Sequence, residues 1–359
     1  MWQSLPHGLD STDIEFKDVS FINSTHGWIV GEDNSDKYGG VILQTNNSGN
    51  NWHLKLFNQS PYHEQIDIVD EQTIWVTGEG ALYYSLDGGN IWNVTAISGS
   101  AGLSFVKFMN QTHGWTASMG VLFATIDGGL NWQVVPGWSF SSDVPRDMHI
   151  ITAEEIWAIG FFGIYYSVDG CETWTKEFDK GGWSLSFVDD TDGWAVSDRM
   201  IAHLGEQKTW SEISLPVGSV TSTSYLTDIQ FIDSETGWIV GGSSVKSFVM
   251  YTPNGGQTWY EQQSQDGIFG RLIAVDFINR THGWAVGHNG IIIRTTTGDS
   301  LGIPLVSDTF IGVILIALVI GIIIISSAIC YYFIRRNKRA RNQLRPQRSQ
   351  TADKSIGIQ

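Results

Sequence analysis

Residues 85–92 read Ser-Leu-Asp-Gly-Gly-Asn-Ile-Trp, and variants of this phrase recur along the chain. Clear copies begin at Thr125, Ser167 and Thr252, and degraded copies span residues 45–52 and 204–210. An Asp carboxylate accepts backbone N–H groups in a tight turn and glycines adopt positive φ, so each copy predicts a hairpin turn followed by a packed Trp. This motif is the Asp-box, and its acids are predicted to be structural rather than catalytic. The defining residues are Asp87, Trp92, Asp127, Trp132, Asp169, Trp174, Asn254 and Trp259.

A second phrase alternates with the Asp-box. It consists of an aromatic residue or Ile, a turn, and a Trp that follows Gly or Ile, and it occurs seven times between Phe21 and Trp284. Successive copies of this Trp are 37 to 47 residues apart, a period suited to four short strands per unit. The sequence therefore predicts an all-β, seven-bladed β-propeller.

The two ends of the repeat region are complementary. The seventh unit stops at residues 295–298 without its Trp, whereas the chain begins with Trp2 in a context resembling that of Trp52. We expect residues 2–5 to supply the missing outer strand of the last blade, because closing the ring removes an exposed sheet edge.

The C-terminal part of the chain lacks the repeats and differs from them in composition. Residues 310–334 hold 25 consecutive residues without a charge, enough for a transmembrane helix, and five bases follow within residues 335–341. The predicted domains are a propeller (1–298), a tether (299–309), a transmembrane helix (310–334) and a basic cytoplasmic tail (335–359). The chain is thus expected to be a single-pass cell-membrane protein with its propeller outside, although no signal peptide is visible at the start. Six Asn-x-Ser/Thr sequons agree with that location, at Asn23, Asn46, Asn58, Asn93, Asn110 and Asn279.

Charge and composition exclude several functions. Residues 1–309 contain 13 bases and 36 acids, and a domain this acidic repels the phosphate backbone of nucleic acid. No pair of histidines has the spacing of zinc ligands, and we expect neither a metal nor another cofactor.

The phrase Gly-Trp-Ile-Val-Gly at residues 27–31 and 237–241, with Gly-Trp-Ala-Val-Gly at 283–287 and the Asp-boxes, resembles the photosystem II stability/assembly-factor-like propellers, also grouped with bacterial neuraminidase repeats. The resemblance covers nearly all of residues 1–298. It implies a seven-bladed propeller and a non-enzymatic role, since the founding members resemble chaperones that assist assembly of a photosynthetic reaction centre.

We therefore expect a membrane-anchored module that binds a protein or a glycan. A membrane-bound glycoside hydrolase is the alternative, because sialidases also carry Asp-boxes. The Arg-Ile-Pro opening motif of sialidases is absent and the acidic domain disfavours an anionic sugar. Hydrolysis of a neutral glycan by two carboxylates stays open, since their separation is not readable from sequence.

Residues that break the repeat are the candidate ligand-binding residues. Trp138 and Trp183 belong to neither phrase and lie in connections that enter innermost strands, where Phe140, Arg146 and Tyr225 share the same face. The alternative is that the two Trp side chains fill gaps between blades.

Polar residues at equivalent positions of four blades form a second candidate set around the channel mouth. These are Asp18, Gln65, Asp147 and Asp228. They are predicted either to bind a cation or polar ligand or to be solvated residues at strand ends.

Overall fold

A computed structural model describes residues 1–11, 13–35, 39–58, 63–138, 143–205, 207–213, 216–217, 224–262 and 270–307. The chain divides into two units, Met1–Ser307 and Asp308–Gln359. The predicted transmembrane helix and basic tail belong to the second unit and lie outside the described residues. Within the described ranges, no helix has the length and apolar character that a membrane span requires.

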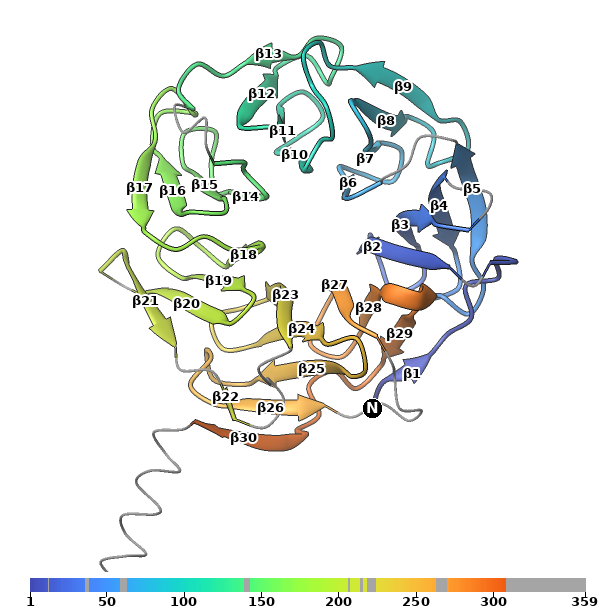
Figure 1. The fold of residues 1–359 in the computed structure, drawn as a ribbon, viewed down its shortest axis with the longest axis vertical. Coiled ribbons are helices and arrows are strands. Elements are labelled where there is room, and N and C mark those ends of the chain that lie inside the picture. Colours follow the sequence, from blue (N-terminus) through green and yellow to red (C-terminus); the bar gives the residue numbers. More distant parts are fainter. Residues whose placement is uncertain are drawn as a thin grey trace, which may run out of the picture. The chain divides into compact units, whose positions relative to one another are not determined.

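The first unit is a ring of seven antiparallel sheets around a central channel, so the predicted seven-bladed propeller is confirmed (Figure 1). Blades 1 to 5 have four strands each, which follow one another in chain order from the channel outward. They are β2 (Ile14–Phe21), β3 (Gly27–Asp33), β4 (Gly39–Thr45) and β5 (His53–Asn58); β6 (Ile66–Ile68), β7 (Ile74–Thr77), β8 (Ala81–Ser85) and β9 (Asn93–Ala96); β10 (Phe105–Phe108), β11 (Gly114–Ser118), β12 (Val121–Thr125) and β13 (Gln133–Val134); β14 (Asp147–Ile150), β15 (Ile156–Ile159), β16 (Ile164–Ser167) and β17 (Thr175–Phe178); and β18 (Ser184–Phe187), β19 (Gly193–Ser197), β20 (Met200–Gly205) and β21 (Thr209–Ile213).

Blade 7 closes the ring with a strand from the other end of the chain. It contains β27 (Leu272–Phe277), β28 (Gly283–Gly287), β29 (Ile292–Thr295) and, outermost, β1 (Gln3–Ser4). Gln3 pairs with Arg294 and Ser4 with Ile293. The predicted N-terminal closure is therefore confirmed. A single-turn 3-10 helix, η1 (His288–Gly290), joins β28 to β29.

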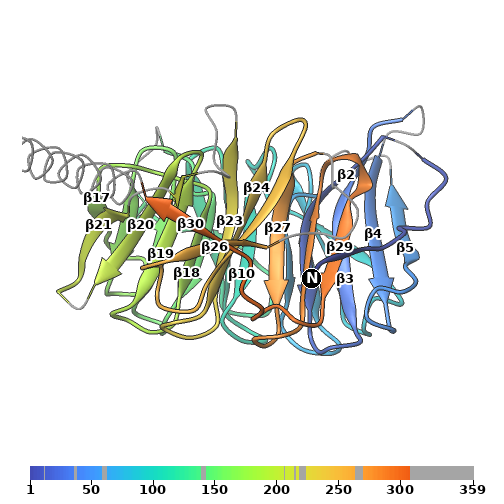
Figure 2. The ribbon, with the colours of Figure 1, turned by 90° about the horizontal axis from the view of Figure 1, so that it is seen from below.

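Blade 6 differs from the expectation. Outside β23 (Tyr225–Phe231), β24 (Gly237–Gly242), β25 (Ser247–Thr252) and β26 (Trp259–Gln262) lie β30 (Ile303–Ser307) and β22 (Pro216–Val217). Residues 303–307, expected to be part of a tether, thus pair with the outer edge of the blade, where Trp259 is opposite Leu305 (Figure 2). The physical reason is that β26 otherwise leaves a row of unpaired backbone groups that an extended segment can satisfy.

Aromatic stacking between neighbouring blades explains the second sequence phrase. The Trp of one blade lies against the Phe that ends the innermost strand of the next, with ring centroids 3.5 Å apart for Trp284 and Phe21, and 3.6 Å for Trp194 and Phe231. Both Trp side chains are fully buried. Each repeat therefore supplies its Trp to the contact with the next blade, and the aromatic residue or Ile of its innermost strand to the contact with the preceding blade.

The Asp-box turns pack against the same Trp residues. Asp87 accepts hydrogen bonds from the Ser85 hydroxyl at 2.8 Å and from the backbone N–H of Ile91 at 2.8 Å. Gly89 has φ +82°, and a Cβ there would lie 3.0 Å from the Trp28 ring of the preceding blade. The carboxylate accepts its hydrogen bonds within the turn, which is the structural role expected from the sequence.

Candidate functional site

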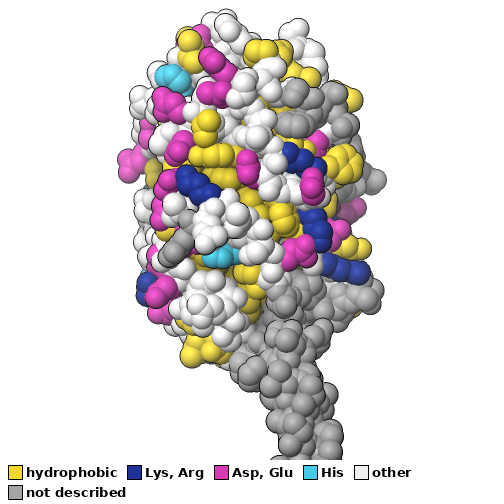
Figure 3. Space-filling view, turned by 90° about the vertical axis from the view of Figure 1, so that its left-hand side faces the viewer, with side chains coloured by type: hydrophobic (Ala, Val, Ile, Leu, Met, Phe, Trp, Pro, Cys, Tyr) yellow, Lys and Arg dark blue, Asp and Glu magenta, His cyan; other side chains and the backbone are white. Residues whose placement is uncertain are grey.

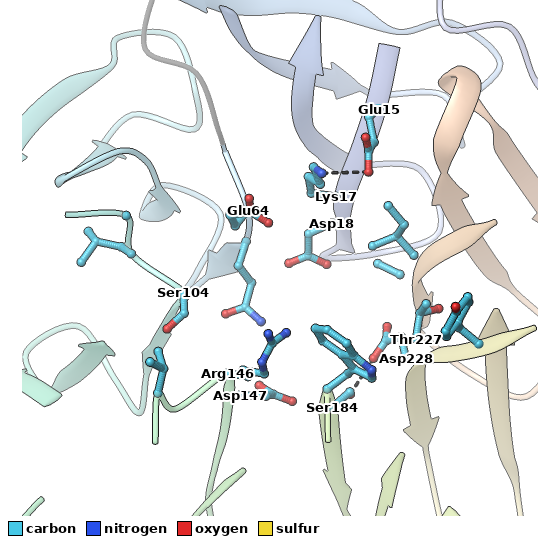
Figure 4. Close-up of a pocket in the computed structure, with 18 of the residues that line it drawn as sticks. Glu15, Lys17, Asp18, Glu64, Ser104, Arg146, Asp147, Ser184, Thr227 and Asp228 are labelled. Atoms are coloured by element: carbon cyan, nitrogen blue, oxygen red, sulfur yellow. Dashed lines mark hydrogen bonds and ion pairs between the residues drawn. The ribbon is translucent and has the colours of Figure 1, made fainter. Parts of the chain in front are cut away.

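A pocket of about 650 Å³ opens at one end of the channel. It is formed by the connections that enter the innermost strands and by the turns between the second and third strands of several blades. Figure 4 shows Asp18 of blade 1, Arg146 and Asp147 of blade 4, and Asp228 of blade 6 around this cavity. Seven of the nine residues predicted to bind a ligand line it: Asp18, Gln65, Arg146, Asp147, Trp183, Tyr225 and Asp228.

Arg146 is held between two aromatic rings at the wall of this pocket. Its guanidinium carbon lies 3.5 Å from the centroid of Phe161 and 3.7 Å from that of Trp183. The Trp183 indole donates a hydrogen bond to Asp198 at 2.6 Å, which fixes the ring. Burial lowers the pKa of Arg146 to about 10, so the guanidinium is still charged at neutral pH. We call Phe161, Arg146 and Trp183 the aromatic clamp.

The clamp presents apolar surface to solvent. Phe161 is 50% exposed, its neighbour Phe162 is 59% exposed and Trp183 is 38% exposed. At the start of the next innermost strand, Tyr225 is 37% exposed and its ring centroid lies 5.5 Å from the guanidinium carbon of Arg271. Exposed aromatic rings beside fixed charges are typical of surfaces that bind proteins or sugars.

The predicted acids have a role that neither sequence hypothesis included. Asp147 accepts the backbone N–H of Met148 in its own strand and that of Leu185 in the next blade, at 2.8 and 2.9 Å. Asp18 and Asp228 bridge to the next innermost strand in the same way, through the N–H groups of Ile66 and Val275. These carboxylates connect adjacent blades. The prediction of solvated strand-end residues is wrong for Asp147, which is 7% exposed.

Two independent facts limit what these acids offer to a ligand. Each carboxylate already accepts backbone N–H groups from two strands. Among the described ranges, no group of three or more His, Cys, Asp or Glu side chains has a metal-binding arrangement.

Enclosure within the ring raises the pKa of the bridging acids, most strongly for Asp18, to about 8. The folded protein binds the proton of the Asp18 carboxyl more tightly than the unfolded chain does. The free energy of unfolding therefore falls as pH rises toward 8, the pKa of Asp18 in the folded state. We expect the free energy of unfolding to drop on the order of 2 kcal/mol between pH 6.5 and 8. Below pH 6.5, His63 and His149 act in the opposite direction, because burial lowers the pKa of each to about 4.

Thermal unfolding of the full chain across pH 6.5 to 8 measures this slope. Asp18→Asn is expected to flatten it, whereas Asp87→Asn leaves it unchanged, because backbone hydrogen bonds lower the pKa of Asp87. An unaltered slope in Asp18→Asn would rule out Asp18 as the source.

Trp138 corrects one prediction. It is 7% exposed and its ring lies edge-on to Tyr165 and Trp174, with centroids 5.0 and 5.2 Å away. Gly137 permits this inward turn, because a Cβ there would lie 2.2 Å from the Cys171 carbonyl oxygen. Trp138 fills a gap between blades and does not line the pocket. Phe140 lies outside the described residues.

Three of the six sequon asparagines have identical turn geometry. The side-chain oxygens of Asn23, Asn110 and Asn279 each accept the N–H groups two and three residues later, at 2.9 Å. Asp70 and Asp233 make the same contacts in other blades. Turn capping thus accounts for these asparagines. They are exposed, as are Asn46 and Asn93, and the side chain of Asn58 lies outside the described residues; glycosylation stays a prediction.

Sequence reasoning selected Arg146 and Trp183 but missed Phe161, the other ring of the clamp, and Asp198. Phe161 and Phe162 form the turn between β15 and β16, where blade 2 has Glu79 between two glycines. The sequence did contain a signal for Phe161, because two adjacent aromatic residues occupy a turn that is small and polar in another repeat. Asp198, in the equivalent turn of blade 5, carried no such signal.

The fold and its repeats define a class: a seven-bladed β-propeller built from Asp-box repeats, and part of it resembles photosystem II assembly factors. Residues 183–296, which cover blade 5 onward, match the family model described as photosynthesis system II assembly factor YCF48. The chloroplastic photosystem II stability/assembly factor HCF136 of Oryza sativa subsp. japonica is 31% identical over 77 residues, 21% of this chain and 18% of the relative. The Arabidopsis thaliana protein of that name is 31% identical over 67 residues, 19% of this chain and 16% of the relative. Each alignment thus spans less than a fifth of the curated relative.

Solved structures extend the likeness in fold to most of the propeller. YCF48 bound to D1 peptide has a TM-score of 0.66 at 19% identity, covering 82% of this chain and 97% of that one. YCF48 from Cyanidioschyzon merolae has a TM-score of 0.62 at 19% identity, with 84% and 99% covered. The GH74 xyloglucanase from Xanthomonas campestris has a TM-score of 0.63 at 11% identity, with 83% of this chain and 54% of the enzyme covered.

Proposed function

We propose that this chain is a non-enzymatic binding propeller that holds a protein segment in the pocket at the channel mouth, and that residues 310–334 anchor it in a membrane with the propeller outside. The observation that carries the proposal of binding is the aromatic clamp. Its rings are exposed although they are fixed by Arg146 and Asp198, so the surface is pre-organised for a partner. A similarly folded protein has been solved bound to a D1 peptide, which supports a peptide-like ligand here.

The hydrolase alternative receives less support. A retaining glycosidase needs two free carboxyl groups about 5 Å apart and an inverting one needs them roughly 6.5–9.5 Å apart. In the described pocket, Asp18, Asp147 and Asp228 are engaged by backbone N–H groups, Glu15 accepts a hydrogen bond from Lys17 at 2.8 Å and Asp198 accepts one from the Trp183 indole at 2.6 Å. Glu64 is then a single candidate rather than one of a pair. The likeness to a xyloglucanase is one of fold alone.

We expect Trp183→Ala and Arg146→Ala each to weaken partner binding at least tenfold, because removing a central aromatic or Arg anchor costs about 2 kcal/mol or more. The measurement is affinity purification with the full chain from detergent-solubilised membranes, with each retained protein quantified by mass spectrometry. Val245→Ser is the matched control, since Val245 is 68% exposed and lies outside the pocket. Equal retention by all three variants would contradict the proposal, and neutral glycans would then be screened for cleavage.

A further inference from the structure

Six aliphatic side chains are exposed on the Asp-boxes and outer strands of blades 2 and 3. Their exposed fractions range from 58% to 78%, far above those of the interblade core. We call these residues the rim patch: Leu86, Ile91, Val94, Ile126, Leu130 and Val134.

The two halves of the rim patch lie on adjacent blades that are in direct contact. The Asp-box glycine Gly129 of blade 3 packs against the Trp75 ring of blade 2, where an added Cβ would lie 2.2 Å from a ring carbon. Gln111 of blade 3 also donates a hydrogen bond to Asp70 of blade 2 at 2.7 Å. The pocket includes Gly78, at the opposite end of β8 from the Asp-box, so the rim patch is separate from the pocket.

The fold does not require apolar residues at these turn positions. In the Asp-box of blade 1, Leu86, Ile126 and Leu130 are replaced by asparagine: Asn46 corresponds to Leu86 and Ile126, and Asn50 to Leu130. The blade 1 turn nevertheless forms the same hydrogen bonds, with Asn47 accepting the N–H of Asn51 at 2.9 Å. Exposed aliphatic side chains therefore cost solvation without serving the turn, which is the mark of an interaction surface.

The sequence that forms blades 2 and 3 is almost free of positive charge. Residues 56–145 contain a single base, Lys107, on the innermost strand, where it faces the acids of the channel. Asp87 and Asp127 adjoin the exposed aliphatic side chains. The hydrogen bonds that each carboxylate accepts within its own turn lower its pKa, so both side chains are anionic. By contrast, lysines of blades 4 and 5 pair with acids, as Lys176 does with Asp179 at 3.0 Å. Basic and acidic side chains are interspersed on the face shown in Figure 3.

We propose that the rim patch binds a cationic amphipathic segment of a protein partner. The aliphatic side chains supply the apolar contact, and Asp87 and Asp127 supply charge complementarity to Lys or Arg residues beside it. An anionic lipid surface is disfavoured, because these same carboxylates repel it. Association of two copies through the patch is disfavoured for the same reason, since both faces would be acidic.

The test uses a fluorescently labelled amphipathic Leu/Lys helix as the probe, titrated against the full chain in a fluorinated surfactant, with surfactant alone as the blank. We expect saturable binding in low salt that weakens in high salt. The variant Leu86→Asn/Ile91→Asn/Ile126→Asn/Leu130→Asn should weaken it at least tenfold. The folded state should tolerate these changes, because blade 1 carries asparagine at the corresponding Asp-box positions. An unchanged circular dichroism spectrum would show that the variant is folded.

Two controls separate this surface from the pocket. Met119→Asn changes an equally exposed aliphatic side chain on the other turn of blade 3 and should leave probe binding unchanged. Trp183→Ala should also leave it unchanged, so this inference can fail without the pocket failing. Equal binding by the quadruple variant, by a scrambled peptide or by a Leu/Glu helix would overturn the proposal. Loss of self-association or of vesicle binding in the quadruple variant, without loss of probe binding, would overturn it in favour of a second copy or a lipid surface.

Discussion

Replacing Trp2 with alanine is expected to lower the free energy of unfolding by about 3–5 kcal/mol, the usual cost of truncating a buried Trp. Trp2 is 1% exposed, and its ring lies edge-on to Phe277 at 5.7 Å. Its indole N–H donates to the side-chain oxygen of Gln262 in blade 6 at 2.9 Å. The variant therefore loosens the contact between blades 6 and 7 as well as the strand that closes the ring.

Thermal and denaturant unfolding of the full chain measure this effect, and Tm should fall on the order of 10 °C. Gln3→Ala is the matched control, because Gln3 is exposed and contributes only its backbone to the closing strand. Weakened closure also exposes the edge of β29, so Trp2→Ala is expected to aggregate more readily. A Trp2→Ala variant within about 1 kcal/mol of the parent would show that ring closure does not depend on this side chain.

Replacing Asp143 with alanine is expected to cost about 3–5 kcal/mol and to disorganise the aromatic clamp. Asp143 is 1% exposed and its carboxylate accepts three hydrogen bonds. The donors are the backbone N–H groups of Phe161 at 2.5 Å and Phe162 at 3.0 Å, and the hydroxyl of Tyr165 at 2.6 Å. Alanine leaves these donors without their acceptor, and the turn that presents Phe161 to Arg146 loses its support.

The readouts are the free energy of unfolding and the retention of partner in the affinity experiment. Tyr165→Phe removes one of the three hydrogen bonds and should cost only about 1 kcal/mol with little effect on binding. Asp143→Ala that retains full stability would contradict the structural role. Lost stability with unchanged partner binding would instead show that the clamp does not need Asp143.

Much of the fold follows from local chemistry in the sequence. Asp87 and its counterparts complete a turn with donors no more than four residues away, so the motif is recognisable without knowledge of the remainder of the chain. The recurring Trp sets the period, and the Trp-containing first residues complete the last unit. The strand at residues 303–307 was missed because no repeat predicts it; its partner is the free edge of β26.

The candidate site was predictable only in part. Trp183 was identified because it lies outside the repeated phrases and Arg146 because it shares a face with it, yet the same reasoning selected Trp138, which is buried. The direction in which a connection turns depends on the backbone of the neighbouring blade, as the approach of Gly137 to Cys171 shows. No spacing rule in a single sequence contains that information.

The sequence by itself determined the class of fold, the number of blades and the closure of the ring, because each repeat encodes its own turn, strand alternation and interblade aromatic residue within about 40 residues. The tertiary structure alone decided that Asp18, Asp147 and Asp228 connect blades, and that Phe161 and Asp198 complete the clamp. It also revealed that the exposed aliphatic residues of blades 2 and 3 lie on adjacent, contacting blades. The reason is physical: turns form between neighbours in sequence, whereas burial and contacts between blades exist only once seven blades have closed into a ring.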